Sequence, residues 1–200
     1  MSKYAVVLGI TRQYGQTVSG GNDAKLFVDL LARAGFKKPN IYRKIGTQVQ
    51  KQDAINGINW MKSVAREEDT VILFFGGHGN YDMIMFSDMG MNSVMLVPLL
   101  SGFQSQKQLV IIDSCRSGSL VQPLSAPHRL VVSSTLADTV NTDEGRYSLF
   151  GHLFLNLGMK QKLADANGDS FVSIQEAQGF AKVRCGIMID NYGQEFFLEG

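Results

Sequence analysis

The amino-acid sequence predicts an α/β protein with a mainly parallel central sheet and helices on both of its faces. Two observations carry this prediction. Short apolar runs alternate along the chain with segments whose apolar residues recur at helical spacing, as in successive β–α–β units. The runs at residues 70–75 and 108–112 are apolar throughout, which is typical of strands covered on both faces. With 200 residues, of which 44% are hydrophobic, we expect one domain over residues 1–200 with a sizeable core.

In the first half of the chain, residues 4–10 (YAVVLGI) predict the first strand. Residues 22–34 predict a helix, because their apolar side chains fall on one helical face and Gly35 follows in the position of a C-cap. Residues 39–43 predict a short second strand. Residues 50–65 again place apolar side chains on one face and predict the second helix.

In the second half, residues 129–133 predict a strand after those at 70–75 and 108–112. Residues 149–163 and 174–183 predict two late helices. The stretch 81–97 contains five of the nine methionines, and we interpret it as an irregular or hairpin insertion rather than a crossover helix. Such a stretch serves either as an adaptable cleft wall or as an apolar hairpin lying on the sheet.

Composition and charge exclude several classes of protein. The formal net charge is +1 with no block of like charges, which argues against a nucleic-acid-binding protein and against a polybasic membrane anchor. No apolar run approaches the roughly 18 residues of a membrane-spanning helix, and the N-terminus shows no signal-peptide pattern. Two cysteines do not make a disulfide scaffold. We therefore expect a cytoplasmic protein, with a monomer favoured.

Chemistry is expected where the parallel strands end, because ligands of open parallel sheets bind beyond the carboxyl ends of the strands. The strand at 70–75 is followed by GGHGN with His78 at its centre, and the strand at 108–112 by DSCRSG with Cys115. A thiol needs a nearby base or cation to become a useful nucleophile at neutral pH. His78 and Cys115 supply that pair if their strands are neighbours.

The residue types alone leave two interpretations of this pair open. Glycine-rich turns after strands are common, a cysteine at a strand end is usually buried packing, and a histidine in a turn is usually solvated. The remaining residues of these two types, His128, His152 and Cys185, are interpreted as core or surface residues.

Asp113 lies two residues before Cys115, and side chains two apart on a strand point to the same face. Its carboxylate would then lie roughly 6 to 7 Å from the position of the nucleophile. That is the reach of a substrate side chain beside the scissile bond, and a carboxylate there would select arginine or lysine. The alternative is that Asp113 caps the following turn through backbone N–H groups.

These motifs resemble a known family. GGHGN and DSCRSG resemble the catalytic histidine and cysteine motifs of caspase-fold peptidases, most closely metacaspases and their bacterial caspase-domain relatives, and more distantly legumains. The resemblance runs over nearly the whole chain. Its further parts are the first strand at residues 3–10, the helix start GNDA at 21–24, the approach to the histidine at 68–79, the late helix at 147–155 and the last strand at 194–200.

The resemblance implies a caspase-like three-layer α/β/α sandwich and a cysteine endopeptidase acting on protein or peptide substrates. Cys115 would attack the peptide carbonyl, and His78 would act as acid and base. The backbone N–H groups of Gly79 and Cys115 would form the oxyanion hole. In the metacaspase branch Asp113 helps to bind a basic side chain, and Asp138 is the candidate for a second acidic pocket residue. The arginines that true caspases use to bind aspartate are not found.

Residues 165–176 resemble an EF-hand loop and predict a calcium site. Position six of the loop is Ser170 rather than glycine, which requires a less favourable backbone conformation. The alternative is an Asx-rich turn that joins two helices. The expected ligands are Asp165, Asn167, Asp169, the carbonyl of Phe171, Ser173 and Glu176.

Two rival functions are weighed against a peptidase. The first is a catalytically silent caspase-fold module that binds calcium and partner proteins; the presence of both His78 and Cys115 argues against it. The second is a nucleotide-binding doubly wound domain, but GGHGN lacks the lysine and the Ser/Thr of a P-loop. If the peptidase is basic-specific, self-cleavage after Arg146 is a further hypothesis, because residues 141–146 form a polar stretch.

Overall fold

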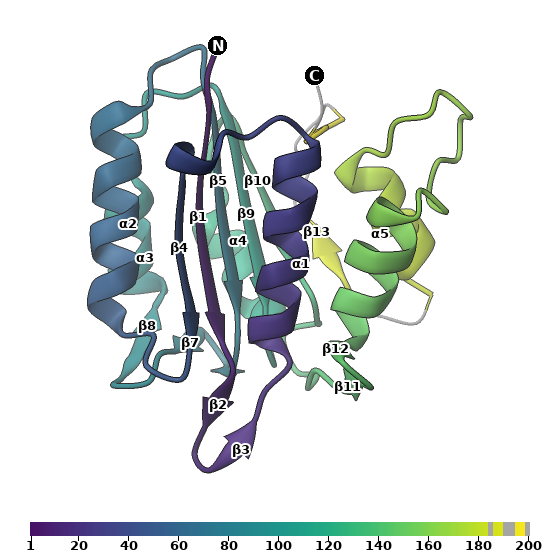
Figure 1. The fold of residues 1–200 in the computed structure, drawn as a ribbon. Coiled ribbons are helices and arrows are strands. Elements are labelled where there is room, and N and C mark those ends of the chain that lie inside the picture. The colour runs from purple at the N-terminus through teal and green to yellow at the C-terminus, as the bar shows by residue number, and fades with distance from the viewer. Residues whose placement is uncertain (184–185, 190–194, 199–200) are drawn as a thin grey trace.

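A sheet of six strands runs through the centre of the computed structural model, which describes residues 1–183, 186–189 and 195–198. The strand order is β4-β1-β5-β9-β10-β13. The first five of these strands are parallel, and β13 pairs antiparallel with β10 (Figure 1). The bounds are β1 Lys3–Ile10, β4 Ile41–Gly46, β5 Thr70–Gly76, β9 Lys107–Asp113, β10 Arg129–Ser133 and β13 Met188–Ile189.

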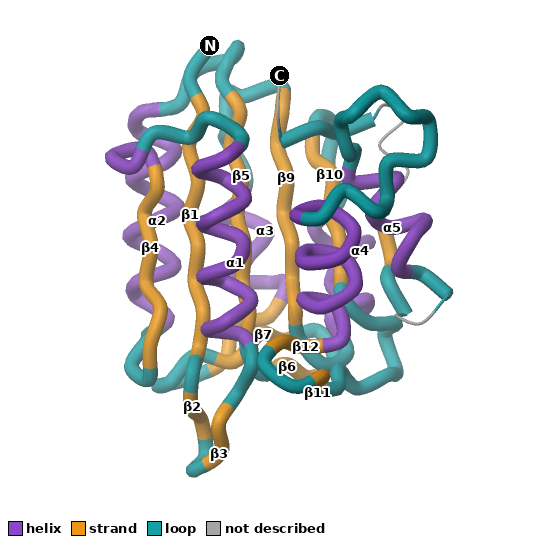
Figure 2. The backbone as a smooth tube through the Cα atoms, turned by 45° about the vertical axis from the view of Figure 1, so that its right-hand side comes forward, coloured by secondary structure: helices purple, strands orange, loops and turns teal. Residues whose placement is uncertain are grey.

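Helices cover both faces of this sheet, so the predicted α/β/α sandwich is confirmed (Figures 1 and 2). One face carries α1 (Gly20–Arg33), the wide-turned π-type helix η3 (Gly151–Lys160) and α5 (Ile174–Ala181). The opposite face carries α2 (Lys51–Val64), α3 (Ser93–Leu100) and α4 (Val121–Leu124). Two short 3-10 turns complete the helical segments: η1 (Lys38–Asn40) and η2 (Ser117–Leu120).

Alternate side chains of the buried strands pack into two separate hydrophobic cores, one on each face of the sheet. In β5, Phe74 stacks on Phe27 of α1 with ring centroids 4.8 Å apart. Its neighbour Phe75 faces the other layer and meets Phe86 edge-on at 5.3 Å. Because successive strand side chains point to opposite faces, an uninterrupted apolar run is what a strand between two helical layers requires.

The interpretation of residues 81–97 as a hairpin insertion without a crossover helix is wrong in part. Short strands β6 (Gly79–Asn80), β7 (Met83–Met85) and β8 (Gly90–Asn92) do form a small antiparallel sheet. The chain then enters α3, which leads back to β9. Asn92 caps this helix by accepting a hydrogen bond from the Met95 N–H, and Leu96 and Leu100 bury its inner face. The helical spacing of these leucines was obscured by the apolar residues on all sides of the segment.

The bounds of other elements differ by a few residues from those that the sequence predicts. The second strand begins at Ile41 rather than at residue 39, because Pro39 lies in the η1 turn and has no N–H to donate to a sheet. Of the last strand expected at residues 194–200, the described part forms an isolated bridge between Phe197 and Ser173. Cys185 lies outside the described residues.

Three small hairpins gather at the carboxyl ends of the parallel strands (Figures 1 and 2). They are β2–β3, β6–β7–β8 and β11–β12, with bounds β2 Arg12–Gln13, β3 Gln16–Thr17, β11 Asp143–Glu144 and β12 Tyr147–Ser148. The carboxyl ends of the strands are therefore enclosed by loops, as a binding site would be. Among the described residues, no helix is long and apolar enough to cross a membrane.

Candidate active site

His78 and Cys115 line the same cavity at the carboxyl ends of β5 and β9. The register pairs Gly76 with Asp113, and the histidine and the cysteine each follow two residues later on neighbouring strands. Both side chains are half-buried. The cavity has a volume of about 150 Å³ and is lined by Gln16, Thr17, Val18, Ser19, Gly20, Gly77, His78, Asp113, Cys115, Asn141 and Asp143.

The immediate surroundings of the two side chains differ. The Sγ atom of Cys115 accepts a hydrogen bond from the Asn141 N–H at 3.2 Å, and it lies 3.9 Å from the Asn141 carbonyl oxygen. The ring of His78 lies against Tyr14, with centroids 6.0 Å apart. Tyr14 belongs to the β2–β3 hairpin and is 74% exposed. The hairpin therefore forms one wall beside the histidine.

The turn that carries the cysteine is held from behind by two hydroxyl side chains that follow β10. Ser134 Oγ accepts from the Ser114 N–H at 3.0 Å, and Thr135 Oγ1 accepts from the Ser117 N–H at 3.0 Å. All four residues are buried. Arg116, between them, has a φ of +55°, in the left-handed region that non-glycine residues rarely adopt. A strained turn held by buried hydrogen bonds fixes the position of the thiol.

Gly79 brings the β6 segment unusually close to the cysteine turn. A Cβ atom on Gly79 would stand 2.7 Å from the carbonyl oxygen of Cys115 and would clash with the Ser114 side chain. Glycine is therefore required at this position. The approach brings the backbone of Gly79 next to that of Cys115, the two residues whose N–H groups are expected to form the oxyanion hole.

Asp113 is the last residue of β9 and is 1% exposed. Its Oδ1 accepts from Asn141 Nδ2 at 2.7 Å, and its Oδ2 accepts from the Ser148 hydroxyl at 3.0 Å. The carboxylate thus bonds side chains from later in the chain instead of capping its own turn. It lines the cavity beside Cys115.

Asp23, in the first turn of α1, is fully buried beside Asp113 and accepts hydrogen bonds from the Ser148 N–H. Burial, and after it repulsion from Asp113, raises the pKa of Asp23 from 3.8 to about 9. Burial also raises the pKa of Asp113, to about 6, while hydrogen bonds from Ser148, Asn141 and neighbouring groups oppose that rise. Asp23 therefore holds a proton at neutral pH, and Asp113 carries the negative charge of the pair.

The other acidic candidate lies elsewhere. Asp138 is exposed on the loop after β10 and is not among the residues that line the cavity. Asp143, at the start of β11, does line it. Sequence reasoning missed Asp23, Asn141, Asp143 and Ser148 as site residues. Asp23 carried a usable signal, because it falls on the same helical face as Phe27 and Leu30, and an acidic side chain on an apolar face needs a partner.

The loop 165–176 forms an ordered turn near the amino ends of the parallel strands, whereas the cavity lies at their carboxyl ends (Figures 1 and 2). Asp165 accepts from the N–H groups of Gly168 and Ser170, and Glu176 accepts from those of Ala166 and Ser173. Ser170 has a φ of +71°, the left-handed conformation that the sixth position requires. Within the described residues, no three His, Cys, Asp or Glu side chains converge as metal ligands.

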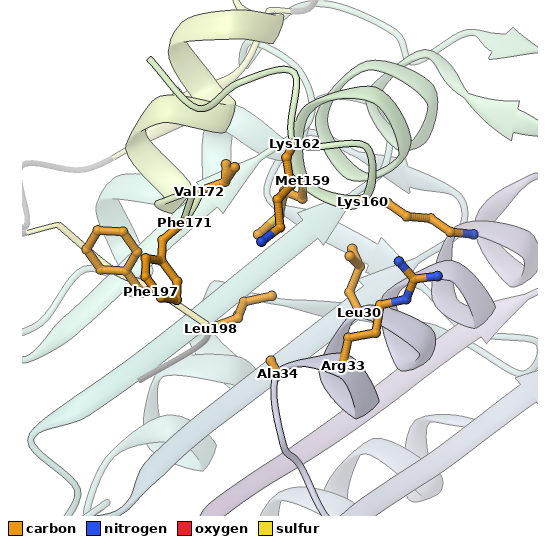
Figure 3. Close-up of a pocket in the computed structure, with 10 residues that line it drawn as sticks. All are labelled: Leu30, Arg33, Ala34, Met159, Lys160, Lys162, Phe171, Val172, Phe197 and Leu198. Carbon is orange, nitrogen blue, oxygen red and sulfur yellow. The ribbon is translucent and has the colours of Figure 1, made fainter. Parts of the chain in front are cut away.

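A separate pocket of about 50 Å³ lies at the C-terminal end of α1, where Arg33, Lys160 and Lys162 surround an apolar floor (Figure 3). The N-terminal end of the same helix, at Gly20, lines the cavity with the cysteine. A helix of 14 residues is about 20 Å long, so the two pockets are distinct.

Comparison with known proteins places the fold and the family. No curated protein matched the chain. A crystal structure of the protein GSU0716 from Geobacter sulfurreducens is similar in fold, with a TM-score of 0.73 over 95% of this chain and 92% of that chain. The two sequences are 16% identical, so this likeness concerns the fold. The family model described as the caspase domain matches residues 2–176, a span that includes His78, Cys115 and Asp113. The chain therefore belongs to the caspase domain family of caspase-fold cysteine peptidases.

Proposed function

We propose that this protein is a cysteine endopeptidase of metacaspase type that cleaves after arginine or lysine, using Cys115 and His78. The observation that carries the proposal is the shared cavity, in which a thiol, an imidazole and a buried carboxylate come from adjacent strand ends. Protein and peptide chains are the substrates that a caspase-domain peptidase would take.

In the proposed reaction, His78 takes the proton of the Cys115 thiol, and Sγ forms a bond to the carbonyl carbon of the substrate. The developing oxyanion accepts hydrogen bonds from the N–H groups of Gly79 and Cys115. The C–N bond then breaks, and His78 returns the proton to the leaving amine. Water hydrolyses the thioester with His78 again as base, which releases the acid product and restores the thiol.

Specificity for a basic residue follows from Asp113. Its carboxylate lies at the floor of the cavity, two residues from the nucleophile, and Asp23 lies behind it. A guanidinium or ammonium group forms charge-assisted hydrogen bonds to such a carboxylate. An aspartate side chain in the same place would be repelled by the negative charge of Asp113. Asp138 stays a proposal as the second acidic residue of the pocket, although it lies on the exposed loop after β10 and is not among the residues that line the cavity with Cys115.

The proposal is tested by hydrolysis of fluorogenic peptides that end in Arg, Lys, Asp or Asn, with the Cys115→Ala protein as control. Cleavage after Arg and Lys that is lost in the variant is the expected result. Cleavage after Asp or Asn would keep the nucleophile and overturn the pocket. If no peptide is cut and a covalent thiol probe does not label Cys115 selectively, the protein is the catalytically silent caspase-fold module instead.

We also propose that the loop 165–176 binds one calcium ion. The donor set fits, because its members offer the carboxylate, amide, hydroxyl and carbonyl oxygens that calcium prefers. Each carboxylate oxygen has two lone pairs, so the hydrogen bonds within the loop do not exhaust its capacity for a ligand. The ligands would be Asp165, Asn167, Asp169, the Phe171 carbonyl, Ser173 and Glu176.

This loop lies near the amino ends of the strands, at the opposite end of the sheet from the cavity. Bound calcium should therefore raise the thermal stability of the protein without changing its peptidase activity. We expect calcium to raise the Tm of the wild-type protein and chelator to reverse the rise, with kcat/KM for an Arg peptide unchanged. The Glu176→Gln protein, compared with its own calcium-free form, should show no rise. An equal rise in both proteins would refute the site.

Self-processing after Arg146 is the last part of the proposal. Arg146 is exposed between β11 and β12, and its carbonyl oxygen accepts a hydrogen bond from Asn22 Nδ2 at 2.9 Å. The neighbouring Asp143 lines the cavity. We expect intact-mass analysis of the incubated protein to show fragments 1–146 and 147–200, and the Cys115→Ala and Arg146→Gln proteins to stay whole. A wild-type chain that also stays whole would remove this part.

A further inference from the structure

Residues 139–142, named here the latch segment, lie across the turn that carries the nucleophile. The carbonyl oxygen of Thr139 accepts from the Arg116 N–H at 2.8 Å, which pairs the two segments at one end. Val140, next in the latch segment, is 63% exposed, so no apolar packing of this side chain anchors the segment. The latch segment is therefore held to the turn mainly by polar contacts.

Asn141 makes the two contacts that matter for the site. Its backbone N–H donates to Cys115 Sγ at 3.2 Å, and its side-chain Nδ2 donates to Asp113 Oδ1 at 2.7 Å. Its Oδ1 accepts from the Thr142 N–H at 3.0 Å, which orients the carboxamide. One residue thus covers both the thiol and the carboxylate that would receive a basic side chain.

Space for movement lies behind this residue. A second cavity of about 280 Å³, named here the rear cavity, is lined by the latch segment together with Ser134, Thr135, Leu149 and Gly186. Asn141 lines both this rear cavity and the cavity with Cys115. A volume of this size can take up an asparagine side chain, so the latch segment can retreat without disturbing either core.

We propose that Asn141 is a displaceable occupant of the specificity pocket, which a basic substrate side chain replaces on Asp113 as the latch segment moves toward the rear cavity. This inference rests on the proposed function, since it assigns a role in the same site. It makes Asn141 a specificity-determining residue: the neutral carboxamide competes with every substrate for one carboxylate.

The competition favours cations. Asn141 brings a neutral donor to the Asp113 carboxylate, whereas a guanidinium or ammonium group brings a positive charge as well as hydrogen-bond donors. The ion pair that such a group forms is therefore stronger than the hydrogen bond from Asn141 that it replaces. A neutral substrate side chain such as glutamine forms with Asp113 a hydrogen bond no stronger than the one from Asn141 that it replaces. Asn141 therefore penalises neutral substrates, and discrimination arises from the occupant as well as from the charge of the pocket.

The test compares wild-type protein with Asn141→Ala and with Asn141→Leu. Leucine keeps most of the side-chain volume but cannot donate a side-chain hydrogen bond to Asp113. Val140→Ala is the matched control in the same segment. The first readout is the rate of alkylation of Cys115 by iodoacetamide, followed by mass spectrometry of the peptide that contains Cys115. It needs no peptidase activity. The second is kcat/KM for peptides that end in Arg or Gln.

We expect alkylation about tenfold faster in both Asn141 variants, equivalent to roughly 1.4 kcal/mol, and unchanged in Val140→Ala. The ratio of kcat/KM for Arg over Gln peptides should fall about tenfold in both. Alkylation rates equal to wild type overturn the inference whether or not peptides are cut. Faster alkylation in proteins that cut no peptide supports the occlusion and refutes the peptidase. Faster alkylation with an unchanged Arg-to-Gln ratio overturns the role in specificity.

Discussion

Two buried carboxyl groups from distant parts of the sequence meet at the cavity. Asp23 and Asp113 share one negative charge, and Ser148 bonds to both of them. Burying two acids this closely is expensive unless one of them keeps its proton. The protonation state of this pair therefore affects both the charge of the site and the stability of the fold.

Asp23→Asn should change the pH dependence of unfolding. In the unfolded chain this carboxyl titrates near 3.8, and in the native state near 9. Between these two pKa values the native state binds a proton that the unfolded chain has released. The stabilisation of the fold by the protonated Asp23 side chain is therefore complete below about pH 4 and is lost as the pH rises toward 9. Asparagine keeps the shape and cannot ionise, so the decline above pH 6, where Asp113 has already titrated, should disappear.

Urea unfolding between pH 5 and 9 measures this effect. Asp29→Asn, on the exposed side of the same helix, is the matched control and should follow the wild-type curve. An Asp23→Asn protein with the wild-type decline above pH 6 would show that the proton resides elsewhere.

At the scale of elements, the site depends on the turn between β9 and η2 and on its support by the residues after β10. Ser134 and Thr135 accept hydrogen bonds from buried N–H groups of the turn, and they are not among the residues that line the cavity with Cys115. They are positioning residues, and their effect should fall on kcat more than on KM.

Thr135→Val replaces the hydroxyl by a methyl group of nearly the same size. It leaves the buried Ser117 N–H without its acceptor, which costs about 1–3 kcal/mol of stability. We expect kcat for the Arg peptide to fall about tenfold or more, since small displacements of a nucleophile are costly, with KM little changed. Thr139→Val, where the hydroxyl pairs with a solvent-accessible N–H, is the control. Equal loss in both variants, or a loss confined to KM, would contradict the positioning role.

At the scale of the whole molecule, the two cores on opposite faces of the sheet separate stability from chemistry. The site residues Asp23 and Ser148 lie on the face of α1 and η3, whereas α2 packs on the opposite face. Changes inside the α2 layer should therefore alter stability without altering the cavity.

Ile58→Ala tests this separation. Ile58 is fully buried in α2, so its truncation should lower the free energy of unfolding by about 2–5 kcal/mol. The kcat/KM of the remaining folded protein should stay within about twofold of wild type. Urea unfolding and peptide hydrolysis at a temperature well below the Tm of the variant give the two numbers. A tenfold loss of kcat/KM with the fold intact would show that the cores are coupled.

The sequence predicted the features that depend on local pattern and on strand order. Continuous apolar runs identified the buried strands, and residues at the strand ends identified His78 and Cys115 before any register was known. Features made by contacts between distant segments were out of reach. The meeting of Asn141 with Cys115 and Asp113 joins positions 26 and 28 residues apart. Nothing in the local pattern around Asn141 indicates that contact.

The order of the strands in the sheet also has a consequence for biosynthesis. After β1 and β4 pair, the sheet grows outward through β5, β9 and β10 in the order in which they leave the ribosome. The residues of the site and its support come from positions 23 to 148 of the chain, so they are made while the sheet is still being extended: Asp23, His78, Cys115, Thr135 and Ser148. A partly translated chain carries the thiol without the partners that position it. For the proposed peptidase, hydrolysis therefore requires the chain to have been made and folded at least as far as Ser148.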